Sequence, residues 1–366
     1  TPRCKSSFAP PTPTTRGRKW LTAWATCGRE PFAHPAYVGL FAAEGEQARC
    51  AVARSAHGLA ILPFILRPIQ VDGWAAESSL MDATSPYGYG GPYGSGEVDW
   101  DEFWSQFMLW MSANKIVSMF GRLALDTLTS GGFPPYVSFR SDSDNVIVDL
   151  TRSPEEQWQH YEHKVRKNVK KAIRASLHIE IRQSFTNLEE FNQLYEATMD
   201  RRAATSWYYF GLDFFTSLAK DLDGSYIVAE VRDGTNRLVS AELVLCSDKY
   251  LYSFLGGTQE DFFRFAPNDL LKHAVIEYGH TSGRAGYVLG GGYTENDGIF
   301  RYKKSFDPTG SVPFQAFGLV ADRGVYDALS SERLSHERSA AAGARLADGF
   351  FPGYRGDTLL DEQAAR

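Results

Sequence analysis

The sequence predicts an α/β protein with mixed sheets, divided into two domains. The chain has 366 residues, whereas a typical domain holds about 100 to 200. Its hydrophobic content of 43% is sufficient for two packed cores. In its second half, three strand-like runs joined by short turns are followed by a helical segment and a return strand, at Tyr226–Val231, Leu238–Cys246, Tyr250–Gly256, Asn268–Tyr278 and Tyr287–Leu289. An antiparallel meander joined to a helix and a return strand indicates a mixed sheet rather than a doubly wound parallel one.

Composition excludes several classes of protein. The net charge of -6 and the pI near 5.8 do not support a dedicated nucleic-acid binder, although a local basic patch stays open. The four cysteines form no CxxC pair and no histidine cluster has metal-ligand spacing. Apolar runs such as Leu59–Leu66 are far shorter than the roughly 20 residues of a membrane span. We therefore expect a cytoplasmic protein without a membrane span, a metal or a cofactor.

Composition along the chain also suggests domain boundaries. Residues 1–17 are rich in Pro, Thr and Ser, which is typical of a flexible leader. We expect a first domain at 18–150, completed by 308–330, and a second domain at 151–307. The remaining residues, 331–366, are expected to form a helical or disordered tail, with a surface helix at Ser335–Leu346 and little order beyond Gly349.

Within the first domain, residue patterns predict a short helix, a set of strands and a long amphipathic helix. The long helix is expected over Asp99–Asn114, because Phe103, Phe107 and Met111 recur at helical spacing. The shorter elements are a helix at Trp20–Ala25 and strands at Tyr37–Ala42, Ala48–Arg54, Leu59–Arg67, Ile116–Arg122 and Asn145–Asp149.

The second domain opens on a strong helix-start signal. Ser153-Pro-Glu-Glu156 combines an N-cap, a proline at the first helical position and a capping-box glutamate. The helix is predicted to run to about Ala175. A strand at His178–Gln183, a helix capped by Asn187 and a helix at Leu212–Lys220 are predicted to follow.

The predicted first helix of the second domain is strongly basic on one face. Six of the eleven residues from Lys164 to Arg174 are Lys or Arg, and none is acidic. Like charges at this spacing destabilise a helix slightly, so an anionic partner such as a phosphate backbone is one interpretation. An ordinary solvated face is the other. The candidate RNA-binding residues are Lys164, Arg166, Lys167, Lys170, Lys171 and Arg174.

Two other segments combine glycine with aromatic or basic residues. The loop at 87–96 offers glycines that could cradle an anion and tyrosines that could stack on a sugar or base, unless it is a flexible surface loop. Its candidate binding residues are Tyr87, Tyr89, Gly90 and Gly91. In Gly290–Phe306, three glycines end a strand and precede an aromatic and basic segment that includes Lys303. Taken alone, this segment is more typical of a basic edge strand.

These segments resemble the Fem-type aminoacyltransferases over roughly residues 20 to 320. The run Gly298-Ile-Phe-Arg-Tyr-Lys303, with Phe306, is similar to the C-terminal signature of the family, although Tyr302 replaces a commoner Phe and Asp307 a common Gly. Arg166 to Ala172 resembles the family helix that opens the second domain, and the tyrosine–glycine loop resembles a Gly-Pro loop in the first.

The resemblance implies two fused GNAT-like N-acyltransferase domains with a cleft between them. It implies an aminoacyl-tRNA donor and an amine-bearing acceptor, either a cell-wall precursor or a natural-product intermediate. Lys303, rather than Lys304, is expected to stabilise the oxyanion that forms when an amine attacks an ester. The expected substrate-binding residues of the second domain are Arg201, Arg202, Tyr208, Tyr252, Tyr293, Glu295 and Tyr302, with Glu295 and Asp297 also considered as bases.

Two alternatives remain open. An acyl-CoA- or carrier-dependent N-acyltransferase of the same fold is one, and a non-catalytic peptidoglycan-binding scaffold is the other. The CoA-binding pattern [QR]-x-x-G-x-[GA] is missing from Gly257–Asn268, which has two acids and no glycine after Gly257. This absence argues against CoA as the donor.

Overall fold

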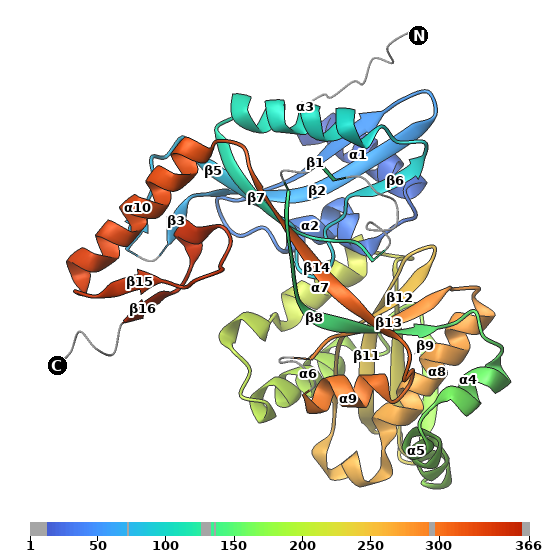
Figure 1. Ribbon diagram of the computed structural model, residues 1–366. Coiled ribbons are helices and arrows are strands. Elements are labelled where there is room, and N and C mark those ends of the chain that lie inside the picture. Colours follow the sequence, from blue (N-terminus) through green and yellow to red (C-terminus); the bar gives the residue numbers. More distant parts are fainter. Residues whose placement is uncertain (1–12, 72, 126–132, 135–136, 293–296, 361–366) are drawn as a thin grey trace. The chain divides into compact units, whose positions relative to one another are not determined.

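The computed structural model describes residues 13–71, 73–125, 133–134, 137–292 and 297–360 (Figure 1). It confirms an α/β protein with mixed sheets. The described parts of residues 1–27, 37–140 and 315–366 form one compact unit, unit 1, and residues 28–36 and 141–314 form a second, unit 2. The chain changes unit after Cys27 and after Ala36, and again within strands β8 (Ser138–Asp149) and β14 (Ser311–Val320).

In unit 1 a mixed sheet carries a long amphipathic helix. The strands follow the order β1-β2-β5-β7-β14, with β6 also paired to β2, and only β5 and β7 are parallel. Helix α3 (Trp100–Ala113) is capped by the Asp99 side chain and buries Phe103, Phe107 and Met111 in the core, as the pattern predicted. The strands are β1 (Gln47–Arg54), β2 (Gly58–Pro68), β5 (Met81–Thr84), β6 (Tyr93–Gly96) and β7 (Ile116–Arg122).

The remaining elements of unit 1 are short or lie near the chain ends. They are α1 (Pro13–Thr26), α2 (Pro35–Leu40), β3 (Gln70–Val71), β4 (Trp74–Ala75), α10 (Arg323–Ala340), β15 (Ala344–Leu346), η4 (Gly353–Arg355) and β16 (Thr358–Leu360). Two sequence predictions are wrong here. The expected strand at Tyr37–Ala42 does not form, and helix α2 covers its first part. In this helix Tyr37 is buried and donates from its hydroxyl to the Tyr87 carbonyl at 2.9 Å.

The second wrong prediction concerns the end of the chain. The helix begins at Arg323 instead of Ser335, and the described residues 350–360 include η4 and β16. Tyr354 is completely buried, and its hydroxyl lies 2.7 Å from that of Ser118 in β7. Arg355 pairs with the buried carboxylate of Asp82. Tyr354 and Arg355 therefore position this end of the chain through contacts with residues that are remote in sequence.

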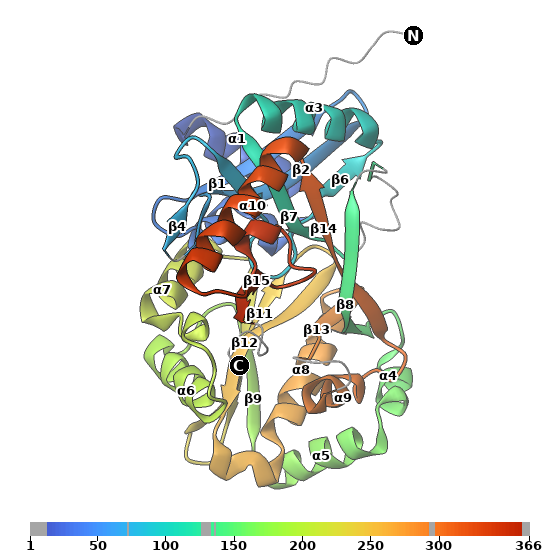
Figure 2. The ribbon, with the colours of Figure 1, turned by 60° about the vertical axis from the view of Figure 1, so that its left-hand side comes forward.

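Unit 2 has a sheet with helices on both faces. Its strands follow the order β8-β13-β12-β11-β10-β9. Figure 2 shows α6 and α7 on one side of these strands, and α8 with α5 (His163–Arg174) on the other. The elements are β9 (His178–Arg182), α6 (Leu188–Arg201), η2 (Ser206–Tyr208), α7 (Gly211–Asp221), β10 (Tyr226–Arg232), β11 (Leu238–Cys246), β12 (Tyr250–Thr258), η3 (Glu260–Phe265), α8 (Pro267–Thr281) and β13 (Gly286–Gly290), with η1 (Pro31–Ala33) from the inserted segment.

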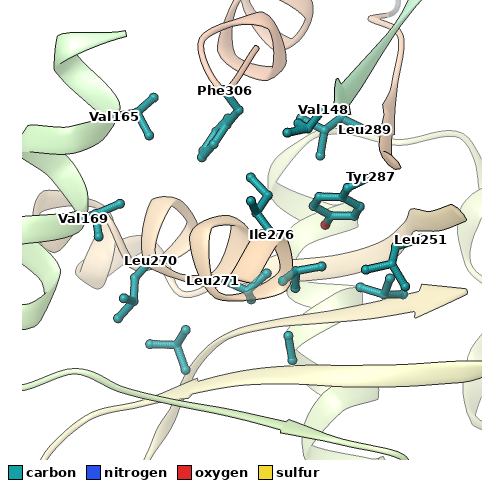
Figure 3. Packing of buried hydrophobic residues seen from close by; sticks show 14 of the residues in the cluster. Val148, Val165, Val169, Leu251, Leu270, Leu271, Ile276, Tyr287, Leu289 and Phe306 are labelled. Carbon is teal, nitrogen blue, oxygen red and sulfur yellow. The ribbon is translucent and has the colours of Figure 1, made fainter. Parts of the chain in front are cut away.

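The core of unit 2 joins α5 and α8 to the sheet. Figure 3 shows Val165 and Val169 of α5 and Phe306 approaching the side chains of α8 and of β8, β12 and β13. The buried residues of α5 are Val165, Val169 and Ala172, which recur at helical spacing and form an apolar stripe. Burial of each valine side chain contributes roughly 1.5 to 3 kcal/mol.

The single helix predicted from Ser153 to Ala175 is two helices. Helix α4 (Pro154–His160) has the predicted capping box, and α5 (His163–Arg174) begins after an extended break at Tyr161 and Glu162. Arg166 holds this break, since its guanidinium donates to the carbonyls of Gln159 and Tyr161. The Glu162 amide donates to Ser305 at 2.9 Å. These partners satisfy backbone groups that a continuous helix would have paired internally.

Candidate active site at the end of β13

The site begins where β12 and β13 stop pairing. These two parallel strands are paired only from Tyr250 to Tyr252 with Gly286 to Val288, although β12 continues to Thr258 and β13 to Gly290. Helix α8 connects them. The free carboxyl ends of neighbouring parallel strands are a common position for ligands in open α/β sheets.

Glycines at the end of β13 let the chain turn closely onto helix α9 (Gly298–Lys304). Gly290 has a φ of +75°, which L side chains rarely adopt, and a Cβ on Gly292 would lie 2.4 Å from an Asp297 carboxylate oxygen. Asp297 caps α9 by accepting the Phe300 amide at 2.7 Å. The basic segment is therefore a capped helix, and its interpretation as an edge strand is wrong.

Lys303 points from α9 back to the end of β13. Its Nζ donates to the Gly291 carbonyl at 2.6 Å, and the Gly290 Cα region is so close that an added Cβ would lie 3.5 Å from Nζ. Burial is the main cause that lowers the pKa of Lys303 from 10.5 to about 8. The positive charges of Lys272 and Arg202 also lower this pKa, whereas Glu242 and Asp297 raise it.

Lys304 is partly exposed, as Lys303 is, but no hydrogen bond or ion pair of its side chain is found among the described residues. The ammonium that contacts the glycines at the end of β13 is that of Lys303, which is the lysine that the family resemblance implies.

A buried polar cluster close to Lys303 was not found from the sequence. Lys272 of α8 donates to Glu242 at 2.6 Å, to Ser253 at 2.8 Å and to the Tyr287 hydroxyl at 3.1 Å. Tyr287 donates to the second Glu242 oxygen at 2.8 Å. Glu242 and Lys272 are only 5% and 6% exposed. The cluster joins β11, β12, α8 and β13 at the point where β12 and β13 part.

A signal for this cluster was present in the sequence. Glu242 interrupts the otherwise apolar or small-residue run from Leu238 to Cys246, in which every residue is buried. A charge in such a strand must be paired, since a lone buried charge is strongly unfavourable. The partner could not be identified, because Lys272 lies on a helix that is remote in sequence.

Aromatic residues hold α9 against the core. Phe300 and Phe306 are buried, and the Tyr302 ring packs edge-on against Phe306 at 5.4 Å. The Tyr302 hydroxyl accepts from Asn268 at 2.8 Å. Burial raises the pKa of Tyr302 well above its ordinary value, so this residue has a clear packing role beside its predicted role in substrate binding.

Asp307, the departure from the family pattern, is a buried junction. Its carboxylate accepts from Arg152 at 2.6 Å and lies 2.8 Å from the His160 Nε2. It also accepts the Asp149 amide at 3.1 Å. This carboxylate therefore joins β8 and α4 to the end of α9.

The other residues predicted in the second domain are distributed over unit 2. Arg201 and Arg202 are exposed at the end of α6, and Tyr208 is partly buried in η2. Tyr252 is buried and donates to Glu30 at 2.7 Å, which ties the 28–36 segment to β12. Tyr293 and Glu295 lie outside the described residues.

The tyrosine–glycine loop lies in unit 1. The Tyr87 carbonyl accepts from Tyr37, and Tyr89 is buried with its carbonyl 3.3 Å from the Tyr93 hydroxyl. A Cβ at Gly90 would lie 2.3 Å from the Ser85 side chain, and Gly91 has a φ of +93°. The start of this segment is thus a tightly packed turn, and from Tyr93 to Gly96 it is strand β6.

The basic helix presents most of its charges to solvent. Lys164, Lys167, Lys170, Lys171 and Arg174 are exposed, whereas Arg166 is partly buried and bonded to backbone carbonyls. The Lys170 ammonium lies 5.7 Å from the Trp158 ring. For Lys167, Lys171 and Arg174, the described part of the chain offers no ion-pair partner.

The segment between β12 and α8 lacks the features of the usual pyrophosphate cradle. It is 3-10 helix η3, with Glu260 and Asp261 in its first turn. Helix α8 then begins at Pro267, which lacks an amide proton, and Asp269 is buried in its first turn. Burial raises the pKa of Asp269 to about 6, against the effect of a hydrogen bond from Asn168. An anion at this helix start would meet a carboxyl group.

Two further features of the described residues concern metal binding and membranes. No group of three or more His, Cys, Asp or Glu side chains there could hold a metal ion. None of the helices in the described ranges has both the length and the apolar composition required to cross a bilayer.

Comparisons with known proteins agree with this architecture. Residues 163–304 match the family described as Acetyltransferase (GNAT) domain, whereas no curated protein sequence is significantly similar to the chain. The crystal structure of FemX superposes with a TM-score of 0.63 at 12% identity, covering 88% of this chain and 99% of FemX. L-PGS from Bacillus licheniformis gives a TM-score of 0.55 at 13% identity, covering 87% and 95%.

A third solved structure of similar fold is the C-terminal domain of a putative lysylphosphatidylglycerol synthetase from Agrobacterium fabrum. Its TM-score is 0.52 at 13% identity, and the match covers 84% of this chain and 92% of that domain. The chain therefore has the Fem-type tandem GNAT-like fold.

Proposed function

We propose that this GNAT-fold acyltransferase takes an aminoacyl group from tRNA and joins it to an amine-bearing acceptor. The observation that supports this most directly is the Lys303 ammonium at the end of β13, half-buried and held 2.6 Å from the Gly291 carbonyl. One of the proteins that share its fold is named for a lysylphosphatidylglycerol product, and such a product carries an aminoacyl ester. The acceptor is a cell-wall precursor or a natural-product intermediate.

In the proposed reaction an amide C–N bond forms and the ester C–O bond to the tRNA breaks. The acceptor amine attacks the ester carbonyl of the aminoacyl-tRNA, and the carbonyl oxygen becomes an oxyanion that Lys303 stabilises. Collapse of this intermediate breaks the bond to the ribose oxygen, which leaves with the proton lost by the amine. Loss of one oxyanion donor typically costs about 2.7 to 4 kcal/mol, which is on the order of a 100- to 1,000-fold lower rate.

The donor assignment is supported by η3 and by α5. The carboxylates of Glu260 and Asp261, together with Pro267 and Asp269, disfavour a CoA pyrophosphate at the start of α8. Exposed lysines on α5 favour a phosphate backbone instead. An acyl-CoA donor remains the second candidate, because residues 163–304 match a GNAT acetyltransferase domain.

The test offers the purified chain charged tRNAs together with two kinds of amine, peptidoglycan precursors and small amines, with and without ribonuclease. We expect amide product that disappears after ribonuclease treatment. Lys303→Ala should lower the rate by about 100- to 1,000-fold, whereas Lys304→Ala, the matched control, should retain most activity. Efficient transfer from acyl-CoA that ribonuclease does not affect would exclude the tRNA donor.

A further inference from the structure

Large aromatic side chains are exposed around the end of helix α6. Trp207 in η2 is 51% exposed, Phe263 in η3 is 50% exposed and Tyr209 is 39% exposed. Single exposed apolar residues are common on proteins, but aromatic groups that gather beside basic residues indicate a binding surface. Neither Trp207 nor Phe263 was among the residues singled out from the sequence.

Contacts at the end of α6 show that these aromatics belong to one surface. Tyr209 donates to Asp200 of α6 at 2.8 Å, which holds η2 against the end of that helix. The next residue, Arg201, places its guanidinium 4.8 Å from the Phe263 ring. The end of α6 therefore lies between η2 and η3, and we call Arg201, Trp207 and Phe263 the aromatic–arginine surface.

The Trp207 ring has a firm support. It packs edge-on against Phe210 at 5.4 Å, and Phe210 stacks on Phe214 at 4.5 Å. A supported ring loses little conformational freedom when a ligand stacks on it, and this favours binding.

Positive charge continues from this surface in two directions. Helix α5, which carries exposed lysines, contacts η3, the element that holds Phe263. On the other side, Arg202 follows Arg201, and the positive charge of Arg202 lowers the pKa of Lys303. Acids are present as well, at Glu260, Asp261 and Asp200. Of these, Asp261 is paired with Arg237 at 3.0 Å, and Asp200 accepts from Tyr209.

We propose that the aromatic–arginine surface binds the unpaired 3′ nucleotides of the aminoacylated RNA, while α5 contacts the phosphates of the adjoining duplex. This inference rests on the proposed function and adds the part of the donor that this surface recognises. Every base offers a flat face to an aromatic ring, and an arginine can both stack on a base and pair with a phosphate. A duplex end without an overhang offers the lysines their phosphates but leaves the rings without a base.

The experiment compares two uncharged RNA hairpins with the same duplex, one blunt and one with four unpaired 3′ nucleotides. Binding to the full chain is measured by fluorescence anisotropy at one fixed salt concentration. We expect tighter binding of the overhang hairpin. Trp207→Ala and Phe263→Ala should each weaken overhang binding by about 5- to 150-fold, the range for the loss of one stacked base, and should change blunt binding little.

Two further variants make the comparison specific. Trp207→Phe keeps a flat ring and should retain most of the preference for the overhang. Phe350→Ala removes another exposed aromatic, 46% exposed in unit 1, and should leave both affinities unchanged. Circular dichroism and thermal melting confirm that each variant is folded.

The outcomes separate this inference from the proposed function. Equal binding of both hairpins, or an equal loss for both in Trp207→Ala, would overturn the role of the surface even if transfer is ribonuclease-sensitive. Trp207-dependent overhang binding with ribonuclease-resistant transfer would instead overturn the tRNA donor alone. A Trp207→Ala effect confined to the KM for acyl-CoA would assign the ring to an adenine and contradict the RNA inference.

Discussion

The Lys303 ammonium lies in a partly buried environment that disfavours its charged form. Its pKa is lowered to about 8, mainly by burial, and only the protonated form can stabilise an oxyanion by charge. Most Lys303 side chains are therefore protonated at about pH 7, and the proton is lost as the pH rises through about 8. A lowered pKa also makes the ammonium a stronger proton donor in hydrogen bonds.

The first prediction concerns this titration. We expect kcat/KM to fall as pH rises through about 8, because the ammonium form of Lys303 is lost. Lys303→Arg should be slower but should show no such alkaline limb, since a guanidinium stays protonated. Rates at pH 6.5 to 9.5, corrected for spontaneous ester hydrolysis, measure both. An alkaline limb that persists unchanged in Lys303→Arg would assign it to another group.

The second prediction concerns the buried cluster. Glu242 raises the pKa of Lys303, so Glu242→Gln should move the alkaline limb to lower pH. It should also destabilise the fold by about 3 to 5 kcal/mol, because Lys272 is left buried without its partner. Glu230→Gln is a matched control, since Glu230 is buried and paired with Arg232 at 3.0 Å. This control variant should lower stability without moving the alkaline limb of the pH profile. An alkaline limb shifted equally in both variants would contradict the effect of Glu242 on the pKa of Lys303.

At the scale of elements, the sequence predicted where helices begin and which apolar residues share a face. It did not predict where a helix is interrupted. Local signals place α3, α4 and α6 correctly because their N-cap residues Asp99, Ser153 and Asn187 act within one turn. The break between α4 and α5 depends on Ser305, which is remote in sequence. Helix α2 was missed for a similar reason, as its Tyr37 is positioned by the carbonyl of Tyr87.

The third prediction separates two neighbouring residues of α5. Arg166→Ala should lower the free energy of unfolding by about 1 to 3 kcal/mol, because carbonyls at the break lose a charged donor. Lys167→Ala should leave stability within about 0.5 kcal/mol and should weaken RNA binding with a smaller salt dependence. Urea unfolding and RNA titrations at several salt concentrations measure these effects. A stability loss of the same size in Lys167→Ala would contradict this division of roles.

At the scale of the whole molecule, the chain has separate cores in its two units. The core around Phe306 and Val165 belongs to unit 2, and the one around Tyr354 and Trp74 to unit 1. The sequence indicated two domains through length and composition. It did not indicate that Tyr354 would be buried, because a lone tyrosine in a polar segment gives no periodic signal.

The fourth prediction uses these separate cores. Phe306→Ala and Tyr354→Ala should each cost about 3 to 5 kcal/mol, with the loss confined to the unit that holds the residue. Hydrogen-exchange mass spectrometry should show faster exchange in α5 and α8 for the first variant, and in α10 and β7 for the second. In the double variant the two losses should add. Faster exchange spread evenly over both units in either single variant would refute separate cores.

The segment from Gly28 to Ala36 has a practical consequence for dissecting the protein. It is encoded before most of unit 1 but belongs to unit 2, where Glu30 accepts from Tyr252 and Phe32 packs against the same ring at 4.8 Å. A contiguous fragment of residues 141–314 would leave this hydroxyl and this ring uncovered. A synthetic peptide of residues 28–36 supplied in trans is the natural partner for such a fragment, which makes unit 2 suited to fragment complementation.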